Sequence, residues 1–230
     1  MSINTTVITI DGPSGTGKGT LCQLLAKELS WNLLDSGALY RVLALAAKQH
    51  SVDLQNEEAL EVLAAHLDVQ FQYNQNIKSS MTILEGENVT DLIRAQECGE
   101  DASIIAQYPK VRVALLERQR AFAQKPGLVT DGRDMGTIVF PDAFLKIFLD
   151  ASVEIRGKRR FLQLKGKGIN ASLAQVVEEL GQRDKRDRGR KIAPLVAAKG
   201  AITIDTTEMS VEQVFSEVLS LVRERAKITQ

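Results

Sequence analysis

The 230-residue chain is 44% hydrophobic, which is enough to bury a full core. Lysine plus arginine and aspartate plus glutamate both number 29, so the formal net charge is zero. This balance argues against a nucleic-acid-binding protein and against a membrane-surface protein. No apolar run approaches the length of a membrane span, the first residues lack a secretion signal, and the chain has only two cysteines, Cys22 and Cys98. We therefore expect a cytoplasmic protein with reduced thiols.

The first predicted elements are a buried strand at residues 7–10 and a helix that begins near Lys18. A glycine-rich loop joins them, and this order is typical of a phosphate-binding loop. Glycines allow successive N–H groups to point at an anion, and the helix N-terminus and Lys18 add positive charge. We expect the chain to bind the phosphates of ATP there. The residues concerned are Gly12, Pro13, Ser14, Gly15, Thr16, Gly17, Lys18, Gly19 and Thr20.

The loop departs from the pattern G-x-x-x-x-G-K-[ST], because Gly19 stands where the metal-binding hydroxyl is usual. Thr20 is the nearest substitute, so the sequence leaves the direct Mg²⁺ ligand open. The alternative, a glycine turn without a ligand, fits poorly between a strand and a helix. The ending Gly-Lys-Gly-Thr is found in nucleoside monophosphate kinases.

Five short apolar runs alternate with helical patterns along the chain, and most of them end in aspartate. This rhythm predicts an α/β fold with a five-stranded parallel sheet in a three-layer α/β/α arrangement, with ligands beyond the carboxyl ends of the strands. The predicted strands are residues 7–10, 33–34, 128–130, 145–149 and 202–204.

One region breaks this rhythm and alternates polar with apolar residues, at 67–73 and again at 81–84. Residues 74–76 and 85–88 are predicted turns. We expect a small antiparallel β insert on the α/β core, because a flexible surface loop would not show this alternation.

The helix predicted after the second strand begins with a second possible anion site. Ser36, Gly37 and Arg41 can meet at its N-terminus and bind a phosphate. The alternative is a helix cap formed by Asp35 or Ser36, with Arg41 in solvent. A kinase needs a second anion site beside its triphosphate loop, which favours the first interpretation.

The segment 131–137, DGRDMGT, follows the third strand. Arg133 is expected to lie between the two phosphate sites. Asp134 can accept a hydrogen bond from an exocyclic amine, which cytosine and adenine carry and uracil lacks. Alternatively, Asp134 is only a structural partner of Arg133.

The most charged stretch is residues 183–191, where Arg183, Asp187 and Arg190 share one face of a predicted helix. The sequence leaves three interpretations open. The stretch is a solvated face with salt bridges, a nucleic-acid patch, or a set of arginines that bind two substrate phosphates while Asp187 holds them in place. The acidic residues and the lack of aromatics disfavour the second interpretation.

Residues 156–168 contain six basic residues and no acidic residue. Arg156 and Arg160 are one helical turn apart, and Gly166 and Gly168 allow hinge movement. The pattern predicts a mobile basic lid over ATP, because phosphoryl transfer needs charge neutralisation and exclusion of water.

Together these segments resemble the bacterial cytidylate kinase family over essentially the whole chain. The resemblance rests on residues 8–15 with 17–20, 34–38 with 40–41, 131–137 and 183–190. It implies one kinase domain over residues 1–230. The core would comprise about 1–35, 104–155 and 169–230, the monophosphate-binding insert about 36–103, and the lid about 156–168.

The resemblance implies a monomeric enzyme that uses Mg²⁺ and transfers the γ-phosphoryl group of ATP to CMP or dCMP. Lys18, Arg133 and Arg183 would be catalytic, and Arg156 and Arg160 would bind ATP together with the glycine loop. Ser103 and Arg112 rest on the resemblance alone, which has them read cytosine with Asp134. The implied CMP-binding residues are Ser36, Gly37, Tyr40, Arg41, Ser103, Arg112, Arg133, Asp134, Arg183, Asp187 and Arg190.

Two rival functions remain open at this stage. One is a kinase of the same fold that acts on UMP, AMP or a non-nucleotide acceptor. The other is a nucleotide-dependent switch or assembly ATPase, although the chain has no Asn-Lys-x-Asp segment for reading guanine.

Overall fold

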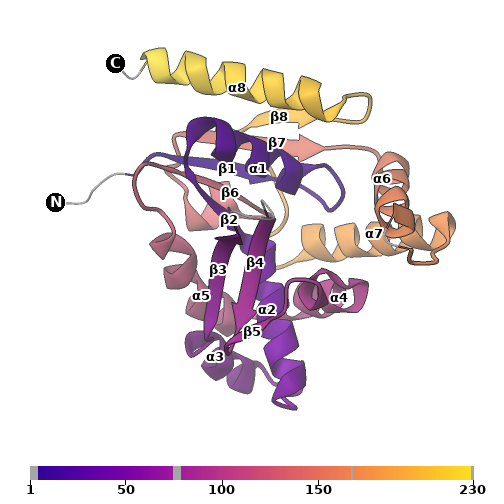
Figure 1. Ribbon diagram of the computed structural model, residues 1–230. Coiled ribbons are helices and arrows are strands. Elements are labelled where there is room, and N and C mark those ends of the chain that lie inside the picture. The colour runs from indigo at the N-terminus through magenta and orange to yellow at the C-terminus, as the bar shows by residue number, and fades with distance from the viewer. Residues whose placement is uncertain (1–4, 75–78, 167, 229–230) are drawn as a thin grey trace. The chain divides into compact units, whose positions relative to one another are not determined.

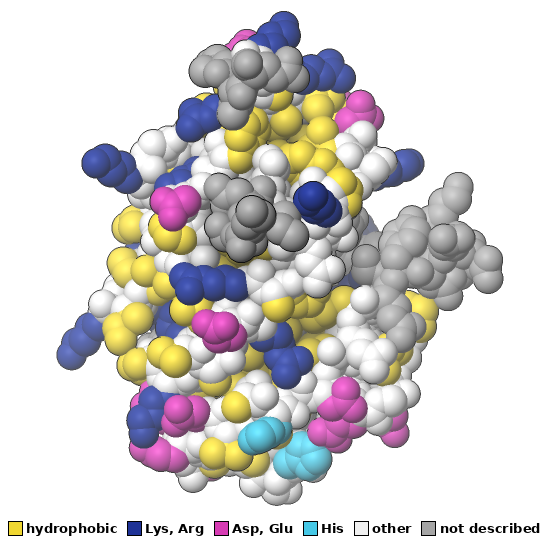
Figure 2. Space-filling model, turned by 90° about the vertical axis from the view of Figure 1, so that its left-hand side faces the viewer, with side chains coloured by type: hydrophobic (Ala, Val, Ile, Leu, Met, Phe, Trp, Pro, Cys, Tyr) yellow, Lys and Arg dark blue, Asp and Glu magenta, His cyan; other side chains and the backbone are white. Residues whose placement is uncertain are grey.

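The computed structural model describes residues 5–74, 79–166 and 168–228 and divides into two compact units (Figure 1). The first unit comprises Met1–Asp35 and Gln119–Gln230, and the second comprises Ser36–Arg118. Among the described residues, no helix is both long enough and apolar enough to cross a membrane. Basic and acidic side chains are interspersed on the face shown in Figure 2, in keeping with the zero net charge.

The first unit is built on a five-stranded sheet in the order β2-β6-β1-β7-β8, and every neighbouring pair is parallel. The strands are β1 (Val7–Asp11), β2 (Asn32–Asp35), β6 (Leu128–Gly132), β7 (Leu145–Asp150) and β8 (Ile202–Asp205). All five predicted strands are confirmed, including the short pair at residues 33–34. The central strand β1 carries the phosphate-binding loop at its carboxyl end.

The first unit also contains the helices α1 (Lys18–Leu29), α6 (Val153–Gly166), α7 (Leu173–Gly189) and α8 (Val211–Ile228), with a short helical turn η2 (Met135–Val139). Leu164 of α6 and Val176 and Leu180 of α7 form a small apolar cluster of their own. One face of the sheet, including Ile8 and Ile10 of β1, is buried against Leu25 of α1 and Val218 of α8. The predicted α/β fold with a parallel sheet is thereby confirmed.

The second unit contains helices and a three-stranded antiparallel sheet in the order β3-β4-β5. Its elements are α2 (Ser36–Gln49), α3 (Glu57–Ala65), β3 (Val69–Asn74), β4 (Ser79–Leu84), β5 (Glu87–Asn88), η1 (Leu92–Arg94), α4 (Gln96–Ile105) and most of α5 (Pro109–Ala121). The predicted β insert is therefore present. Of the first predicted turn, residues 75–76 lie outside the described residues.

The second predicted turn is a two-residue hairpin loop between β4 and β5, with Leu84 paired to Glu87. Glu85 and Gly86 both have positive φ, at 50° and 85°. Two consecutive positive φ values are what a type I′ turn requires, and this turn matches the twist of the flanking strands.

The second unit ends at Arg118, whereas the sequence predicted that the insert ends near residue 103. Val111 and Leu115 of α5 are fully buried in the same hydrophobic cluster as Leu43 and Leu60. The unit therefore extends through most of α5, because this helix completes its core.

The packing of α6 on α7 depends on Gly157, where an added Cβ would lie 2.3 Å from Cγ2 of Val177. We predict that Gly157→Ala destabilises the protein by ~1–3 kcal/mol through overpacking. Urea denaturation measures this change. In the control Gly181→Ala the new Cβ meets nothing within 4 Å, so helix propensity should stabilise the protein by ~0.5–1 kcal/mol. Equal effects of the two substitutions would contradict this account of the packing.

Candidate functional site

The loop between β1 and α1 has the backbone geometry of a phosphate-binding loop. Gly12 has φ +147°, and a Cβ at this position would lie 2.0 Å from the backbone oxygen of Leu149 on β7. Gly17 has φ +93° and immediately precedes the first turn of α1. Side chains at these two positions would be strained, so the sequence has glycine where the chain turns from strand to helix. The loop therefore presents the helix N-terminus beyond the central strand.

Lys18 is the first residue of α1 and is 6% exposed. Its Nζ donates a hydrogen bond of 2.7 Å to the backbone oxygen of Pro13, and Oγ1 of Thr16 donates one of 3.1 Å to the same oxygen. Burial lowers the pKa of Lys18, and the positive charges of Arg133 and Arg183 lower it further. The three predicted catalytic residues therefore interact electrostatically within the first unit.

Carboxylates at the ends of adjacent strands offset this positive charge. Asp131 of β6 is paired in register with Asp35 of β2. Burial and the charge of Asp35 raise the pKa of Asp131, whereas Lys18 opposes that shift. Oδ1 of Asp131 is buried and has no hydrogen-bond partner. One carboxylate oxygen at the carboxyl edge of the sheet is thus left to interact with a ligand.

Asp11, the last residue of β1, is also buried. Its two oxygens accept hydrogen bonds from the backbone N–H groups of Met135 and Gly136, at 2.9 and 2.8 Å. Burial raises its pKa from 3.8 to about 6, although these two hydrogen bonds oppose the shift. The sequence placed an aspartate at this strand end but contained no signal for its partners, which are 124 and 125 residues away.

Asp187 of α7 lies among three arginines and is 1% exposed. Nε of Arg133 donates to Oδ2 at 2.8 Å, Nη2 of Arg190 donates to Oδ1, and Nε of Arg183 is 3.9 Å from Oδ2. Burial alone would raise the pKa of Asp187, but the three arginines together lower it. The face that carries Arg183, Asp187 and Arg190 is therefore not a solvated one. Asp187 contacts the arginines, and the binding of substrate phosphates by these arginines stays a prediction.

Arg190 reaches this cluster differently from the prediction. The helix ends at Gly189, and Arg190 has an extended backbone with φ −60° and ψ 136°. The predicted i, i+4, i+7 spacing on one helix therefore stops before Arg190. Its side chain nevertheless returns to Asp187 three residues earlier.

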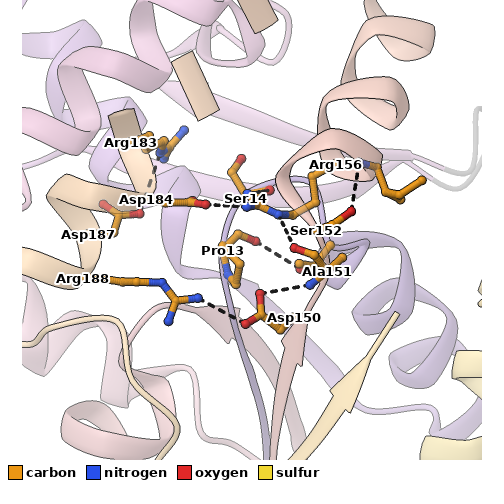
Figure 3. Close-up of polar contacts among 12 residues, drawn as sticks. Pro13, Ser14, Asp150, Ala151, Ser152, Arg156, Arg183, Asp184, Asp187 and Arg188 are labelled. Carbon is orange, nitrogen blue, oxygen red and sulfur yellow. Dashed lines mark hydrogen bonds and ion pairs between the residues drawn. The ribbon is translucent and has the colours of Figure 1, made fainter. Parts of the chain in front are cut away.

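For Arg156 the sequence predicted an ATP ligand in a mobile lid, and the structure gives the contacts that this residue makes within the protein. In the structure it belongs to α6 and is 3% exposed. It donates to the backbone oxygens of Ser14 and Ala151, at 3.0 and 2.9 Å, and to Oδ2 of Asp184 (Figure 3). Its donors are thus directed at the protein itself, and it joins the phosphate-binding loop to α6 and α7. Arg160, also on α6, is half-buried.

In the second unit, the predicted phosphate residues lie at the start of α2. Ser36 is its first residue and is 3% exposed, and Gly37 follows. One turn later, Nη1 of Arg41 donates to the backbone oxygen of Ile93 at 2.8 Å. A Cβ on Gly99 would lie 3.2 Å from Nη2 of Arg41, so the guanidinium packs against the backbone of α4. This contact excludes the alternative of a freely solvated Arg41.

The two predicted base-reading residues of the second unit, Ser103 and Arg112, come from α4 and α5. Arg112 of α5 has its guanidinium carbon 5.8 Å from the ring centre of Tyr40 on α2, a cation–π distance. Nη1 of Arg112 also donates to the backbone oxygen of Ala106 at 3.0 Å. Ser103 of α4 is 2% exposed. Arg112 is thereby fixed over Tyr40.

The predicted CMP residues fall into two groups, one in each unit. Ser36, Gly37, Tyr40, Arg41, Ser103 and Arg112 belong to the second unit, and Arg133, Asp134, Arg183, Asp187 and Arg190 to the first. A glycine loop after the central strand of a parallel sheet, with a buried lysine and clustered arginines, defines the first unit as a P-loop kinase fold.

Comparisons with known proteins identify the family. A family model described as cytidylate kinase matches residues 8–224. The chain is 58% identical to the cytidylate kinase of Azotobacter vinelandii (strain DJ / ATCC BAA-1303), over 98% of each chain. It is 60% identical to that of Pseudomonas syringae pv. tomato (strain ATCC BAA-871 / DC3000), over 96% of each chain. The chain belongs to the cytidylate kinase family.

The comparison with solved structures supports the fold only. An uncharacterized protein from Eubacterium ventriosum ATCC 27560 has 11% sequence identity and a TM-score of 0.51. The match covers 96% of this chain and 99% of the other.

We predict that Asp187→Asn destabilises the protein by ~3–5 kcal/mol, because it leaves buried guanidinium charge without its carboxylate. Urea denaturation measures the change. Arg188→Ala is the control, since Arg188 and its partner Asp150 are 48% and 38% exposed and such pairs contribute ~1 kcal/mol or less. If Asp187→Asn lowers the free energy of unfolding by no more than the control does, the result would contradict a buried charge cluster.

The pH dependence of stability should contain a component from Asp11. Its pKa is raised from 3.8 to about 6 in the folded state, so the unfolded chain loses this proton first. Stability therefore falls as the pH rises from ~4 to ~6, by about 3 kcal/mol, and then levels off. We predict that Asp11→Asn removes this fall. Denaturation of the wild-type and Asp11→Asn proteins at pH 4, 5, 6 and 7 tests this prediction. The same dependence of the free energy of unfolding on pH in the two proteins would contradict the raised pKa.

Proposed function

We propose that the protein transfers the γ-phosphoryl group of ATP to CMP or dCMP, giving ADP and CDP or dCDP. Membership of the cytidylate kinase family carries this function. The first unit has the groups that the donor half of the reaction needs, namely a phosphate-binding loop, a buried lysine and clustered arginines.

The ATP phosphates bind at residues 12–20. Backbone N–H groups at the N-terminus of α1 surround them, and Lys18 moves from the oxygen of Pro13 to the β- and γ-phosphates. Arg160 contributes from α6, as the sequence predicted. Arg156 acts instead through the loop, which it holds at the backbone oxygen of Ser14.

The donor set fits Mg²⁺ bound largely by the substrate. Among the described residues, no group of three or more His, Cys, Asp and Glu side chains could hold a metal ion. Asp131 offers one unpartnered carboxylate oxygen, and the exposed Thr20 offers a hydroxyl on the first turn of α1. One or two protein oxygens with phosphates and waters is a usual Mg²⁺ site. The ion would neutralise charge on the β- and γ-phosphate oxygens.

The phosphate and sugar of CMP are bound by Ser36, Arg41, Arg183 and Arg190. Ser103, Arg112 and Asp134 read cytosine. Asp134 is 3% exposed, and a buried carboxylate favours a base that donates through an exocyclic amine. The site around these groups is shaped by Gly37, Tyr40, Arg133 and Asp187.

The acceptor is a phosphate monoester that is largely ionised at neutral pH, so the reaction needs no strong general base. Catalysis depends on positioning and on stabilising charge that spreads over the transferred group. Lys18, Arg133 and Arg183 supply this charge. The positions of Arg133 and Arg183 are set in part by Asp187, which contacts both arginines.

We predict that Arg183→Ala lowers kcat by ~100-fold or more and raises the KM for CMP only modestly, since it acts mainly at the transition state. Steady-state kinetics with CMP varied measure the split. Arg188→Ala, on the same helix and half exposed, is the control and should change kcat by less than ~3-fold. Unchanged turnover of Arg183→Ala would remove it from this role.

The reaction itself is tested by measuring ADP release from Mg-ATP with CMP, dCMP, UMP or AMP, and with no acceptor. We expect fast release with CMP and dCMP and little with AMP. Fast release with UMP or AMP alone would redirect the proposal to another acceptor. Release that is independent of any acceptor would indicate a switch ATPase and would overturn the kinase assignment.

A further inference from the structure

One buried carboxylate that the reaction does not use directly connects two parts of the first unit. Asp11 ends β1 and immediately precedes Gly12 of the phosphate-binding loop. Its Oδ1 accepts the N–H of Met135, and its Oδ2 accepts that of Gly136. These amides belong to the first turn of η2, which follows β6. A single side chain thus joins the base of the loop to the start of η2.

The helical turn η2 is not capped by a side chain of its own segment. Asp134 precedes η2 at the capping position but makes no side-chain hydrogen bond to the turn. The first N–H groups of a helical turn lack partners within the turn, so they need an acceptor from elsewhere. Asp11 satisfies two of them at once, and both of its oxygens are engaged. The position of η2 therefore depends on β1.

The close approach at Gly136 supports the same dependence. A Cβ there would lie 2.9 Å from Oγ1 of Thr9 and 3.4 Å from Oδ2 of Asp11. Thr9 is two residues before Asp11 on β1, so its side chain lies on the same face of the strand. Its Oγ1 is buried and has no hydrogen-bond partner. The absence of a side chain at residue 136 is what lets its N–H reach the carboxylate.

The segment that Asp11 holds carries two proposed acceptor-binding residues. Arg133 and Asp134 directly precede Met135, and Arg133 donates to Asp187 at 2.8 Å. The charged groups that act on Asp11 are Lys18 of α1, which favours its ionised form, and Asp134, which opposes it. A movement of the turn would displace Arg133 and Asp134 together, since both are within two residues of the held amides.

We propose that Asp11 is a positioning residue of the kinase reaction, which fixes Arg133 and Asp134 for the acceptor nucleotide by binding the Met135 and Gly136 amides. The inference rests on the proposed function and deepens it. Asp11 itself touches no substrate in this account. Its side chain acts on the acceptor half of the site, so its loss should affect CMP more than ATP.

The first test compares Asp11→Asn with the wild-type protein. The asparagine keeps the shape but presents an NH₂ group to one of the two amides, which leaves that N–H without an acceptor. We expect the KM for CMP to rise ~10-fold and the KM for ATP to change by less than ~3-fold. CMP titration by calorimetry should show the same loss of affinity without turnover.

Asp205→Asn is the matched control. Asp205 also ends a strand of the same sheet and accepts a backbone N–H, that of Thr207, at 2.9 Å. The oxygen Oδ1 of Asp205 accepts from the N–H and the hydroxyl of Thr207, which is not part of η2, so the KM for CMP should stay within ~2-fold of the wild-type value.

A second pair of variants reaches the same contact from the other side and does not depend on the folding of Asp11→Asn. Gly136→Ala places a methyl group against Thr9 and should raise the KM for CMP. Adding Thr9→Ala removes the closest atom, and it breaks no hydrogen bond because Oγ1 of Thr9 has no partner. The double variant should recover at least half of the loss in CMP affinity.

The outcomes separate the inference from the function on which it rests. A selective rise in the KM for CMP, with rescue by Thr9→Ala, supports a positioning role. Folded variants with an unchanged KM for CMP, or with equal increases for CMP and ATP, overturn it while leaving the kinase function intact. If the wild-type protein itself shows no CMP-dependent ADP release, the proposed function fails first.

Discussion

The arrangement of positive charge in the first unit depends on the contacts of the buried Asp187 carboxylate with three arginines. Guanidinium groups that share a buried region repel one another, and they are stable there only when a carboxylate compensates them. Asp187 contacts Arg133, Arg183 and Arg190, which come from the segment after β6 and from both sides of the end of α7. The contacts that compensate the charges of these arginines also fix the directions of their side chains. The stability of the fold and the proposed function therefore both depend on Asp187.

The phosphate-binding loop is held in a comparable way by groups outside it. Gly12 lets the chain pass close to β7, and Arg156 binds the backbone oxygen of Ser14 while Asp184 compensates its charge. The loop thus has a fixed backbone before any nucleotide arrives. Since catalysis of phosphoryl transfer depends mainly on positioning and charge, such preorganisation serves the proposed reaction directly.

Much of the fold could be predicted from local patterns. The apolar runs at residues 7–10 and 145–149 have the composition of buried parallel strands, and the alternation at 67–73 indicated the antiparallel insert. The extent of the second unit was predicted less well, because α5 has weak local periodicity and its assignment depends on which core buries Val111 and Leu115. The burial and contacts of Arg156 were also not predicted, since a run of basic residues does not reveal which of them is buried.

The sequence by itself determined the order strand, glycine loop, helix, and hence a phosphate-binding loop with Lys18 at the start of α1. These features are local, because backbone freedom at glycine and apolar spacing act within a few residues. Only the tertiary structure decided the partners of Asp11, Arg156 and Asp187. Two of the three, Asp11 and Arg156, bind groups more than a hundred residues away, and Asp187 binds Arg133 across 54 residues. Such pairings follow from strand order and helix packing, which no local pattern contains.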